Sequence, residues 1–284
     1  METDKKKLIQ IDQFLEKLGG IPPIPAVARK VLRLAGSDDA RLADIARLIA
    51  TDQGLATQIL RMCNSAYYGI PHRVKSLSRA VALLGFKSVR NLVVIHSLPR
   101  RRSGTPTFAE AAIWTHSTAG AIVARLLALE TQAADPEEAM LGGLIHDTGR
   151  LVLNMLIPDH YEPVMRAIYN REGPSVEIER EAMGIDHTTV GEAVLRKWNF
   201  PDELVDTVRR HHDASDTLDP LTLIVQAANE ELWILGMGVR EPAEPVTELP
   251  PALGRLGYSL EELPELEERM RAAMESGKEF FGQV

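Results

Sequence analysis

The chain has 284 residues, enough for one large domain or two smaller ones, and its 45% hydrophobic and 25% charged content is ordinary for a soluble globular protein. A single cysteine, Cys63, excludes a disulfide framework. The N-terminus lacks the apolar core of a signal peptide, and no apolar run approaches the length of a membrane span. We therefore expect a cytoplasmic protein with no membrane partner.

The net charge of −8 is divided unevenly along the chain. Residues 1–105 hold 18 lysines and arginines against 8 aspartates and glutamates, whereas residues 106–284 hold 14 against 32. Either the two halves attract each other, or the basic half binds an anionic partner. Because the basic residues are dispersed and cluster only at residues 100–102, we favour attraction between the halves and expect no nucleic-acid partner.

The first half predicts five or six short helices joined by tight turns, without an alternating strand pattern. Apolar residues recur at helical spacing in residues 4–18, 27–34, 42–49 and 53–67. The three prolines of IPPIP predict an extended entry to the second of these helices. Ser76 and Ser88 are expected to cap two more helices, with Gly85 between them.

The second half predicts a further series of helices and completes an all-α fold. A long helix is expected over residues 108–129, and Asp135 followed by Pro136 is typical of a helix start. The remaining helices are expected near residues 158–171, 175–183, 187–198, 201–212, 221–235 and 259–281.

The segment RRRSGTPT, residues 100–107, is typical of a linker or a joint between subdomains. With the change of charge near the same point, it predicts two helical subdomains, residues 1–105 and 106–284, which together form one module over about residues 18–284.

An apolar segment, LGGLIHDTGRL at residues 141–151, contains the adjacent His146 and Asp147. Burying either group without a partner is costly, so each needs a backbone group, a side chain or a metal ion. The other histidines favour a metal, because five histidines and Asp147 form an ordered series that could converge from several helices on one or two divalent ions. The series is His116, His146, Asp147, His187, His211 and His212.

Several segments resemble, in the same order, the HDOD domain of bacterial signalling proteins, an offshoot of the HD superfamily of metal-dependent phosphohydrolases. They are IPPIP, DQGLATQILRMCNSAYYG, SLSRAVALLG, GGLIHDTGRLVL, EAMGIDHTTVGEAVLRKWNFP and the His-His pair. The resemblance extends from residue 18 to about residue 235. It implies a helical module that contacts signalling proteins and is usually not catalytic.

The resemblance also implies a set of ligands. In the related HD-GYP phosphodiesterases, two metal ions are ligated by a His, a His-Asp doublet, a His, a His-His pair and a final Asp. The series above matches all of these except the last, where Asn229 offers only a neutral, weaker oxygen ligand. The Gly-Tyr-Pro signature of those enzymes is also absent, since DASDTLDP follows His212. We expect one or two divalent ions, iron or manganese.

Two functions remain open at this point. In a phosphohydrolase acting on a nucleotide or phosphodiester, Asp147 would bridge two ions that activate water, and Arg150 would face a phosphate. The departure at Asn229, the missing Gly-Tyr-Pro signature and the usual inactivity of the family favour a regulatory module without catalysis. Its partners would be signalling proteins and, as a ligand, a nucleotide or another phosphate-containing molecule.

Each candidate ligand also has a purely structural alternative. His116 fits a buried core histidine, His146 and Asp147 a hydrogen bond between helices, and the His-His pair surface groups at a helix C-terminus. Their joint presence favours metal binding. We assign structural roles to the remaining candidates, His72, His96, His160, Asn64 and Cys63.

Overall fold

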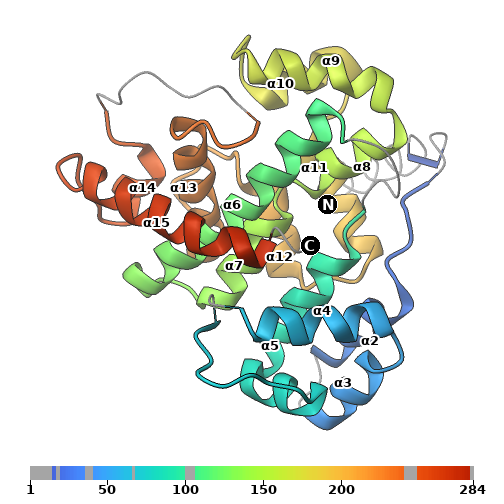
Figure 1. Cartoon of the computed structure of the whole chain (residues 1–284). Coiled ribbons are helices and arrows are strands. Elements are labelled where there is room, and N and C mark those ends of the chain that lie inside the picture. The colour runs from blue at the N-terminus through green and yellow to red at the C-terminus, as the bar shows by residue number, and fades with distance from the viewer. Residues whose placement is uncertain are drawn as a thin grey trace. The chain divides into compact units, whose positions relative to one another are not determined.

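The computed structural model describes residues 15–16, 20–35, 41–65, 68–99, 106–239 and 248–281. Every regular element within these ranges is an α-helix (Figure 1), which confirms the predicted all-α fold. The predicted helix over residues 4–18 and the predicted joint at residues 100–107 fall almost entirely outside the described ranges.

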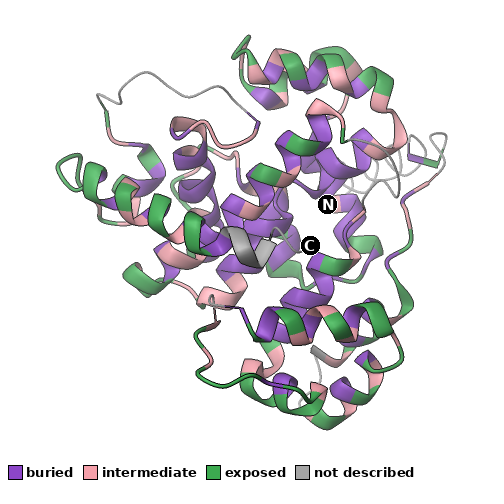
Figure 2. Ribbon diagram, viewed as in Figure 1, coloured by how far each residue is buried: buried purple, intermediate pink, exposed green. Residues whose placement is uncertain are grey.

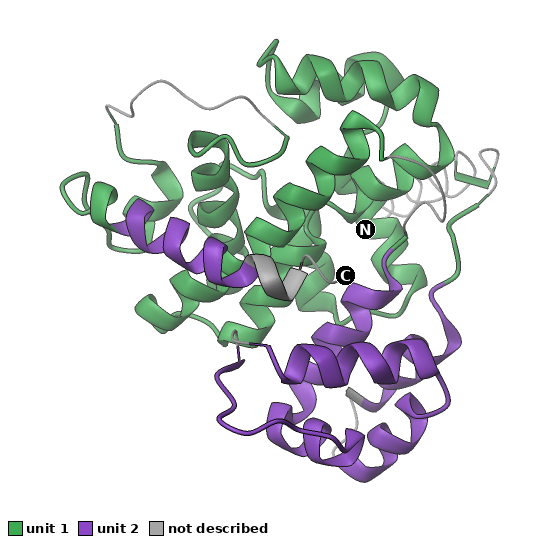
Figure 3. Cartoon of the chain, in the orientation of Figure 1, with its two compact units in different colours: residues 1–23, 99–265 green, residues 24–98, 266–284 purple. Residues whose placement is uncertain are grey.

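Contacts divide the chain into two compact units (Figure 3). The larger unit contains residues 1–23 and 99–265, and the smaller contains residues 24–98 and 266–284. The break after residue 98 lies near the boundary predicted at residue 105, but the two ends of the chain are grouped differently from the prediction. One contact that places the entry segment in the larger unit is the hydrogen bond from Trp198 Nε1 to Pro22 O, at 2.9 Å.

The smaller unit contains α2 (Ala26–Ala35), α3 (Leu42–Ile49), α4 (Gln53–Cys63) and α5 (Leu77–Ser97). Helix α5 is kinked at Gly85, whose φ of 76° is unfavourable for other residues, and Ser88 therefore lies within the helix after the kink and does not cap it. Helix α4 ends earlier than predicted, because the amide of Asn64 turns back to bond the backbone N–H and C=O of Val74. This pairing gives Asn64 the predicted structural role.

The larger unit is built from α6 to α14, and α15 begins within it. The helices are α6 (Phe108–Thr131), α7 (Pro136–Ile145), α8 (Thr148–Leu156), α9 (Pro158–Tyr169), α10 (Ser175–Met183), α11 (His187–Lys197), α12 (Asp202–Arg210), α13 (Pro220–Ile234), α14 (Pro251–Arg255) and α15 (Leu263–Phe281). Helix α6 packs on α7 and α13, and α8 packs on α11. The buried residues of these helices form the core of the unit (Figure 2).

Aspartate caps fix where several of these helices begin. Asp135 accepts hydrogen bonds from the N–H groups of Glu137 and Glu138, and Asp186 accepts one from Thr189 N, as both helix-start patterns predict. The last helix begins at Leu263, later than predicted, because Ser259 bonds the carboxylate of Glu262 in a preceding turn.

Two helices, α5 and α6, are long and apolar enough to cross a membrane by length and composition alone. Most of the apolar window of each, 61% in α5 and 67% in α6, is buried by the rest of the chain. This burial is that of core helices in a folded domain.

Candidate metal centre

His116 and His146 face each other because α6 and α7 approach closely at two glycines. A Cβ atom on Gly120 would lie 2.8 Å from Gly143 O, so a side chain there would separate the helices. His116 lies one turn before Gly120, and His146 directly follows α7. Their ring centroids are therefore only 5.1 Å apart.

The other members of the series lie at helix ends. Asp147 precedes α8, His187 is the first residue of α11, and His211 with His212 follows α12. His212 is partly exposed, whereas the other five members are at most 1% exposed. The structure thus brings all six predicted residues together in the interior of the larger unit.

The four fully buried imidazoles share one orientation. In each, Nδ1 contacts an oxygen outside the cluster, so that Nε2 points toward Asp147. The acceptors are Met237 O for His116 (3.0 Å), Gly143 O for His146 (2.8 Å), Val208 O for His211 (2.8 Å) and Glu179 Oε2 for His187 (2.5 Å). Imidazoles held in this way by outer acceptors are typical of metal ligands.

The two carboxylate oxygens of Asp147 face different histidines. Oδ2 lies 3.6 Å from His146 Nε2 and 3.8 Å from His116 Nε2, whereas Oδ1 lies 3.3 Å from His187 Nε2 and 3.7 Å from His211 Nε2. The ligand atoms form two close groups, His116 with His146 and Asp147, and His187 with His211 and His212. Asp147 lies where one carboxylate can serve both groups.

The cluster has more acceptors than protons to share among them. Burial lowers the pKa values of His146, His211 and His212, so these rings are neutral near pH 7. His187 Nε2 nevertheless lies 3.3 Å from His211 Nε2 and 3.2 Å from His212 Nε2. His146 Nε2 and Asp147 Oδ1 are buried without a hydrogen bond to any described residue. Crowded lone pairs of this kind fit a cation, and the residues present can hold a divalent metal ion.

Asn229, on α13, occupies the remaining side of the first group. Its Oδ1 lies 2.9 Å from His116 Nε2, while His116 Nδ1 lies 3.0 Å from Met237 O. Burial lowers the pKa of His116 to about 4, and a neutral ring donates only one hydrogen bond. One of these two contacts therefore requires a cation near Nε2 or a rotated Asn229 amide that donates to it. Asn229 is thus close enough to act as the predicted weak ligand.

Arg150 is buried and paired with carboxylates. Its Nε lies 3.0 Å from Asp147 Oδ2, and its Nη1 donates to Glu179 Oε1 at 2.8 Å. Burial alone would raise the pKa of Asp147, but Arg150 and the imidazoles hold it well below its usual value. The predicted contact of Arg150 with a phosphate gains no support from this position, because its guanidinium is buried and already paired with two acids.

Glu179, on α10, is a member of the centre that the sequence reasoning missed. Its carboxylate, 0% exposed, accepts bonds from the backbone and ring of His187, from Arg150 and from Tyr161. A sequence signal exists: Glu179 lies three residues after Val176 and four before Met183, on the face where α10 carries its apolar residues. A carboxylate in that stripe predicts a buried acid with a cationic or N–H partner.

The three histidines outside the series do not belong to either group of possible ligands. His72, His96 and His160 are exposed, and His96 Nδ1 lies 2.5 Å from Gln58 Oε1 in the smaller unit. Cys63 is fully buried, as expected of a small apolar residue.

The buried imidazoles predict an acid-sensitive fold when no metal is bound. The pKa of His116 is about 4 in the folded chain and about 6.5 when unfolded, so the unfolded state binds more protons between these values. The free energy of unfolding should therefore fall as the pH drops from 7.5 to 4.5, by about 2 to 3 kcal/mol from His116 alone. Urea unfolding of EDTA-treated protein between pH 7.5 and 4.5 measures this change in the free energy of unfolding.

Two variants separate His116 from the other titrating groups. His116→Gln should show a shallower loss of stability on acidification than the natural chain, whereas His96→Gln, which removes an exposed histidine, should leave the slope unchanged. Equal slopes for His116→Gln and the natural chain would contradict the assignment.

Comparison with known proteins adds a family and a set of folds. The sequence pattern of the HDOD domain matches residues 21–214. A curated but uncharacterised protein of Treponema pallidum (strain Nichols) is 26% identical over 239 residues, which are 83% of this chain and 46% of that protein. The chain thus spans about half the length of this relative.

Three solved structures share the fold over nearly the whole chain. An HDOD domain protein of unknown function from Geobacter sulfurreducens is 20% identical with a TM-score of 0.79, covering 97% of this chain and 98% of that one. A proposed phosphohydrolase from Shewanella amazonensis SB2B is 20% identical, with a TM-score of 0.72 and coverage of 98% and 97%. A proposed signal transduction protein from Marinobacter aquaeolei VT8 is 24% identical, with a TM-score of 0.71 and coverage of 98% and 66%.

Proposed function

Because this chain belongs to the HDOD domain family, we propose that it is a regulatory module of bacterial signalling, built around a buried transition-metal centre and acting mainly through contacts with other proteins. The solved relative from Marinobacter, named as a proposed signal transduction protein, supports this class of function. The metal proposed is iron or manganese, held by the imidazoles and Asp147.

The charge of the centre is the observation that carries the proposal. Within it, the described carboxylates are Asp147 and Glu179, and Arg150 cancels one of their two charges. Two divalent ions would leave a large positive charge in a buried site, which is costly. A carboxylate at residue 229 would reduce this charge, but Asn229 is neutral. We therefore infer that one ion binds firmly and a second binds weakly.

A weak second ion favours regulation over hydrolysis. In a two-metal hydrolase the pair of ions lowers the pKa of a water molecule and stabilises the attacking and the leaving oxygen of the displacement. In this chain, the second ion would be held by three neutral residues, His116, His146 and Asn229. The only negative charge in this group of described residues would be that of Asp147, which the first ion shares. One firmly held ion can still lock α8, α11 and α12 together, because Asp147, His187 and the His211–His212 pair lie at the ends of these helices.

A metal-dependent phosphohydrolase remains the second candidate. The position of Asp147, with one oxygen toward each group of histidines, is the observation that favours it. The proposed phosphohydrolase from Shewanella, with the same fold, is consistent with this candidate. Asp147 would then be the bridging ligand, and a nucleotide or phosphodiester the substrate class.

Asn229→Asp distinguishes the two functions. The added carboxylate should raise the bound metal from about one ion toward two per chain, because it supplies the missing charge. On a panel of phosphatase and phosphodiesterase substrates, we expect no turnover by the metal-loaded natural chain, by Asn229→Asp or by Asp147→Ala. Metal content is measured by elemental analysis of protein purified without a histidine tag.

Gln226→Glu is the matched control, since it places a carboxylate on the same helix, one turn away, where Gln226 bonds Asp213 O outside the metal centre. It should leave the metal content unchanged. Turnover by the natural chain that disappears in Asp147→Ala would decide for the phosphohydrolase and against the regulatory module.

A further inference from the structure

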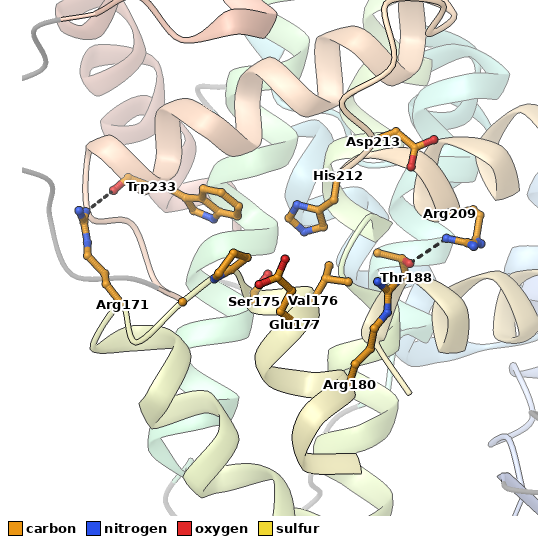
Figure 4. A pocket seen from close by; sticks show the side chains of 12 residues that line it. Arg171, Ser175, Val176, Glu177, Arg180, Thr188, Arg209, His212, Asp213 and Trp233 are labelled. Atoms are coloured by element: carbon orange, nitrogen blue, oxygen red, sulfur yellow. Dashed lines mark hydrogen bonds between the residues drawn. The ribbon is translucent and has the colours of Figure 1, made fainter. Parts of the chain in front are cut away.

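A pocket of about 670 Å³ opens beside the metal centre, within the larger unit. Its walls come from the start of α10, from α11 and α12, and from Trp233 on α13 (Figure 4). His212 belongs to both sites: its ring lines the pocket, and its Nε2 lies 3.2 Å from His187 Nε2 in the centre. This volume is typical of sites for small molecules.

One side of the pocket carries two arginines held in place by neighbours. Arg180 Nε donates to Asp186 Oδ2 at 2.7 Å. Arg209 Nη1 donates to Thr188 Oγ1 at 3.3 Å, and Arg209 Nε pairs with Glu192 Oε2 at 3.2 Å. Their side chains are 51% and 33% exposed, so N–H groups not used in these bonds remain accessible. Figure 4 places both guanidinium groups on the same side, beside Thr188. Oriented guanidinium pairs suit phosphate oxygens.

The start of α10 adds further donors between the two sides. Its N-cap, Pro174, has no side-chain oxygen to accept from the first turn of the helix. Ser175 lines the pocket and is only 2% exposed, yet its buried Oγ makes no hydrogen bond with any described residue. A buried hydroxyl without a partner at a helix N-terminus is a position where an anion would be bound.

The other side of the pocket is aromatic. The indole of Trp233 stacks on the ring of His212, with centroids 5.4 Å apart and planes 23° apart. Arg171 Nη2 donates to Trp233 O at 3.3 Å and helps to fix the position of this residue. Trp233 and His212 both line the pocket and are partly exposed, so part of their aromatic surface is accessible to a planar group.

We propose that this pocket binds a phosphate ester that carries an aromatic ring, such as a nucleoside monophosphate. The phosphate lies at Arg180, Arg209 and the start of α10, and the ring lies against Trp233. Glu177 and Asp213, which also line the pocket, accept from hydroxyl or amino groups of the ligand. Only the role of this ligand, as the signal that the regulatory module detects, rests on the proposed function. Binding itself requires no metal ion.

Calorimetric titration of the 284-residue chain tests the site, with the four ribonucleoside monophosphates, adenosine and inorganic phosphate as probes. Each is titrated into metal-loaded and EDTA-treated protein. At least one monophosphate should bind both forms, about tenfold or more tightly than adenosine or phosphate. Arg209→Gln should weaken its binding about tenfold, and Arg180→Lys, which keeps the charge but loses the paired donors, should weaken it less than Arg180→Gln.

Trp233→Leu should weaken the monophosphate while leaving the affinity for inorganic phosphate unchanged. The matched control is Arg166→Gln, because Arg166 also pairs with an acid, Glu162, but lies outside the pocket. This variant should bind like the natural chain, and thermal unfolding confirms that each variant is folded.

Three results would overturn the proposal. They are absence of binding by every monophosphate, equal affinity for monophosphate and phosphate, and binding that is lost in Asp147→Ala but kept in Arg209→Gln, which would place the ligand on the metal centre. Failure of the proposed function is seen separately, as a lack of bound metal, while pocket binding to EDTA-treated protein is unaffected.

Discussion

Asp147→Ala is expected to remove metal from both halves of the centre. Asp147 is the carboxylate that faces both groups of histidines, with Oδ2 toward His146 and Oδ1 toward His187. Its loss removes the negative charge closest to either ion, and we expect metal affinity to fall by about a hundredfold or more, since even outer partners of ligands contribute 10- to 100-fold. Elemental analysis after dialysis against a weak chelator measures the effect.

The variant should still fold, which makes the measurement interpretable. Arg150 keeps its bond to Glu179 when Asp147 is removed, so its buried charge stays paired. Added metal should raise the Tm of the natural chain but not that of Asp147→Ala, because only a folded state that binds the ion is stabilised. Asp159→Ala, which removes an exposed acid in the first turn of α9, is the control for charge and should keep its metal. A variant that retains the natural metal content would refute the centre as described.

The sequence was sufficient to predict most of the helices and to single out the convergent histidines, but it predicted neither α14 nor the break between α7 and α8. Helix starts such as Asp135–Pro136 and Asp186 were predictable, because the capping carboxylate bonds an N–H group within three residues of it in the sequence. The histidine series was recognisable because its members are chemically unusual in apolar segments, and the structure brings all of them together with Asn229. Their binding of metal stays a prediction.

The features that could not be predicted from the sequence depend on how deeply individual side chains are buried and on what they contact. Helical spacing places Arg150 one turn after Asp147, but it does not show whether the guanidinium reaches solvent or pairs inside with Glu179. The partner comes from α10, a separate helix, and its distance to Arg150 is fixed only by packing. Similarly, the sequence does not distinguish the glycines at residues 120, 143 and 149 from glycines in an exposed helix. Their role is seen only in the structure, where the backbone of another helix contacts them.

Gly149→Ala is expected to show how strongly the centre depends on one such backbone contact. A Cβ atom at this position would lie 2.7 Å from His187 C and 2.9 Å from Gly191 N, and still closer to His187 O. These are backbone atoms of α11, so α8 must move away, and Asp147 would separate from His187. We expect a loss of about 3 kcal/mol or more in the free energy of unfolding and weaker metal binding, although no ligand is removed.

Two further glycine variants serve as comparisons for the loss of stability expected in Gly149→Ala. Alanine in a helix is otherwise favoured over glycine by about 1 kcal/mol, so Gly254→Ala in α14, where the new Cβ would meet a Leu249 side chain at 3.4 Å, should leave the protein as stable or slightly more stable. Gly191→Ala should be intermediate, because the atom nearest to its Cβ would be a side-chain atom, Val208 Cγ1 at 2.6 Å, while the nearest backbone atom, Gly149 N, lies at an ordinary contact distance of 3.4 Å. Urea unfolding and metal content are measured for all three. If Gly149→Ala matched Gly254→Ala in both, the close approach of α8 and α11 could not be what holds Asp147 beside His187.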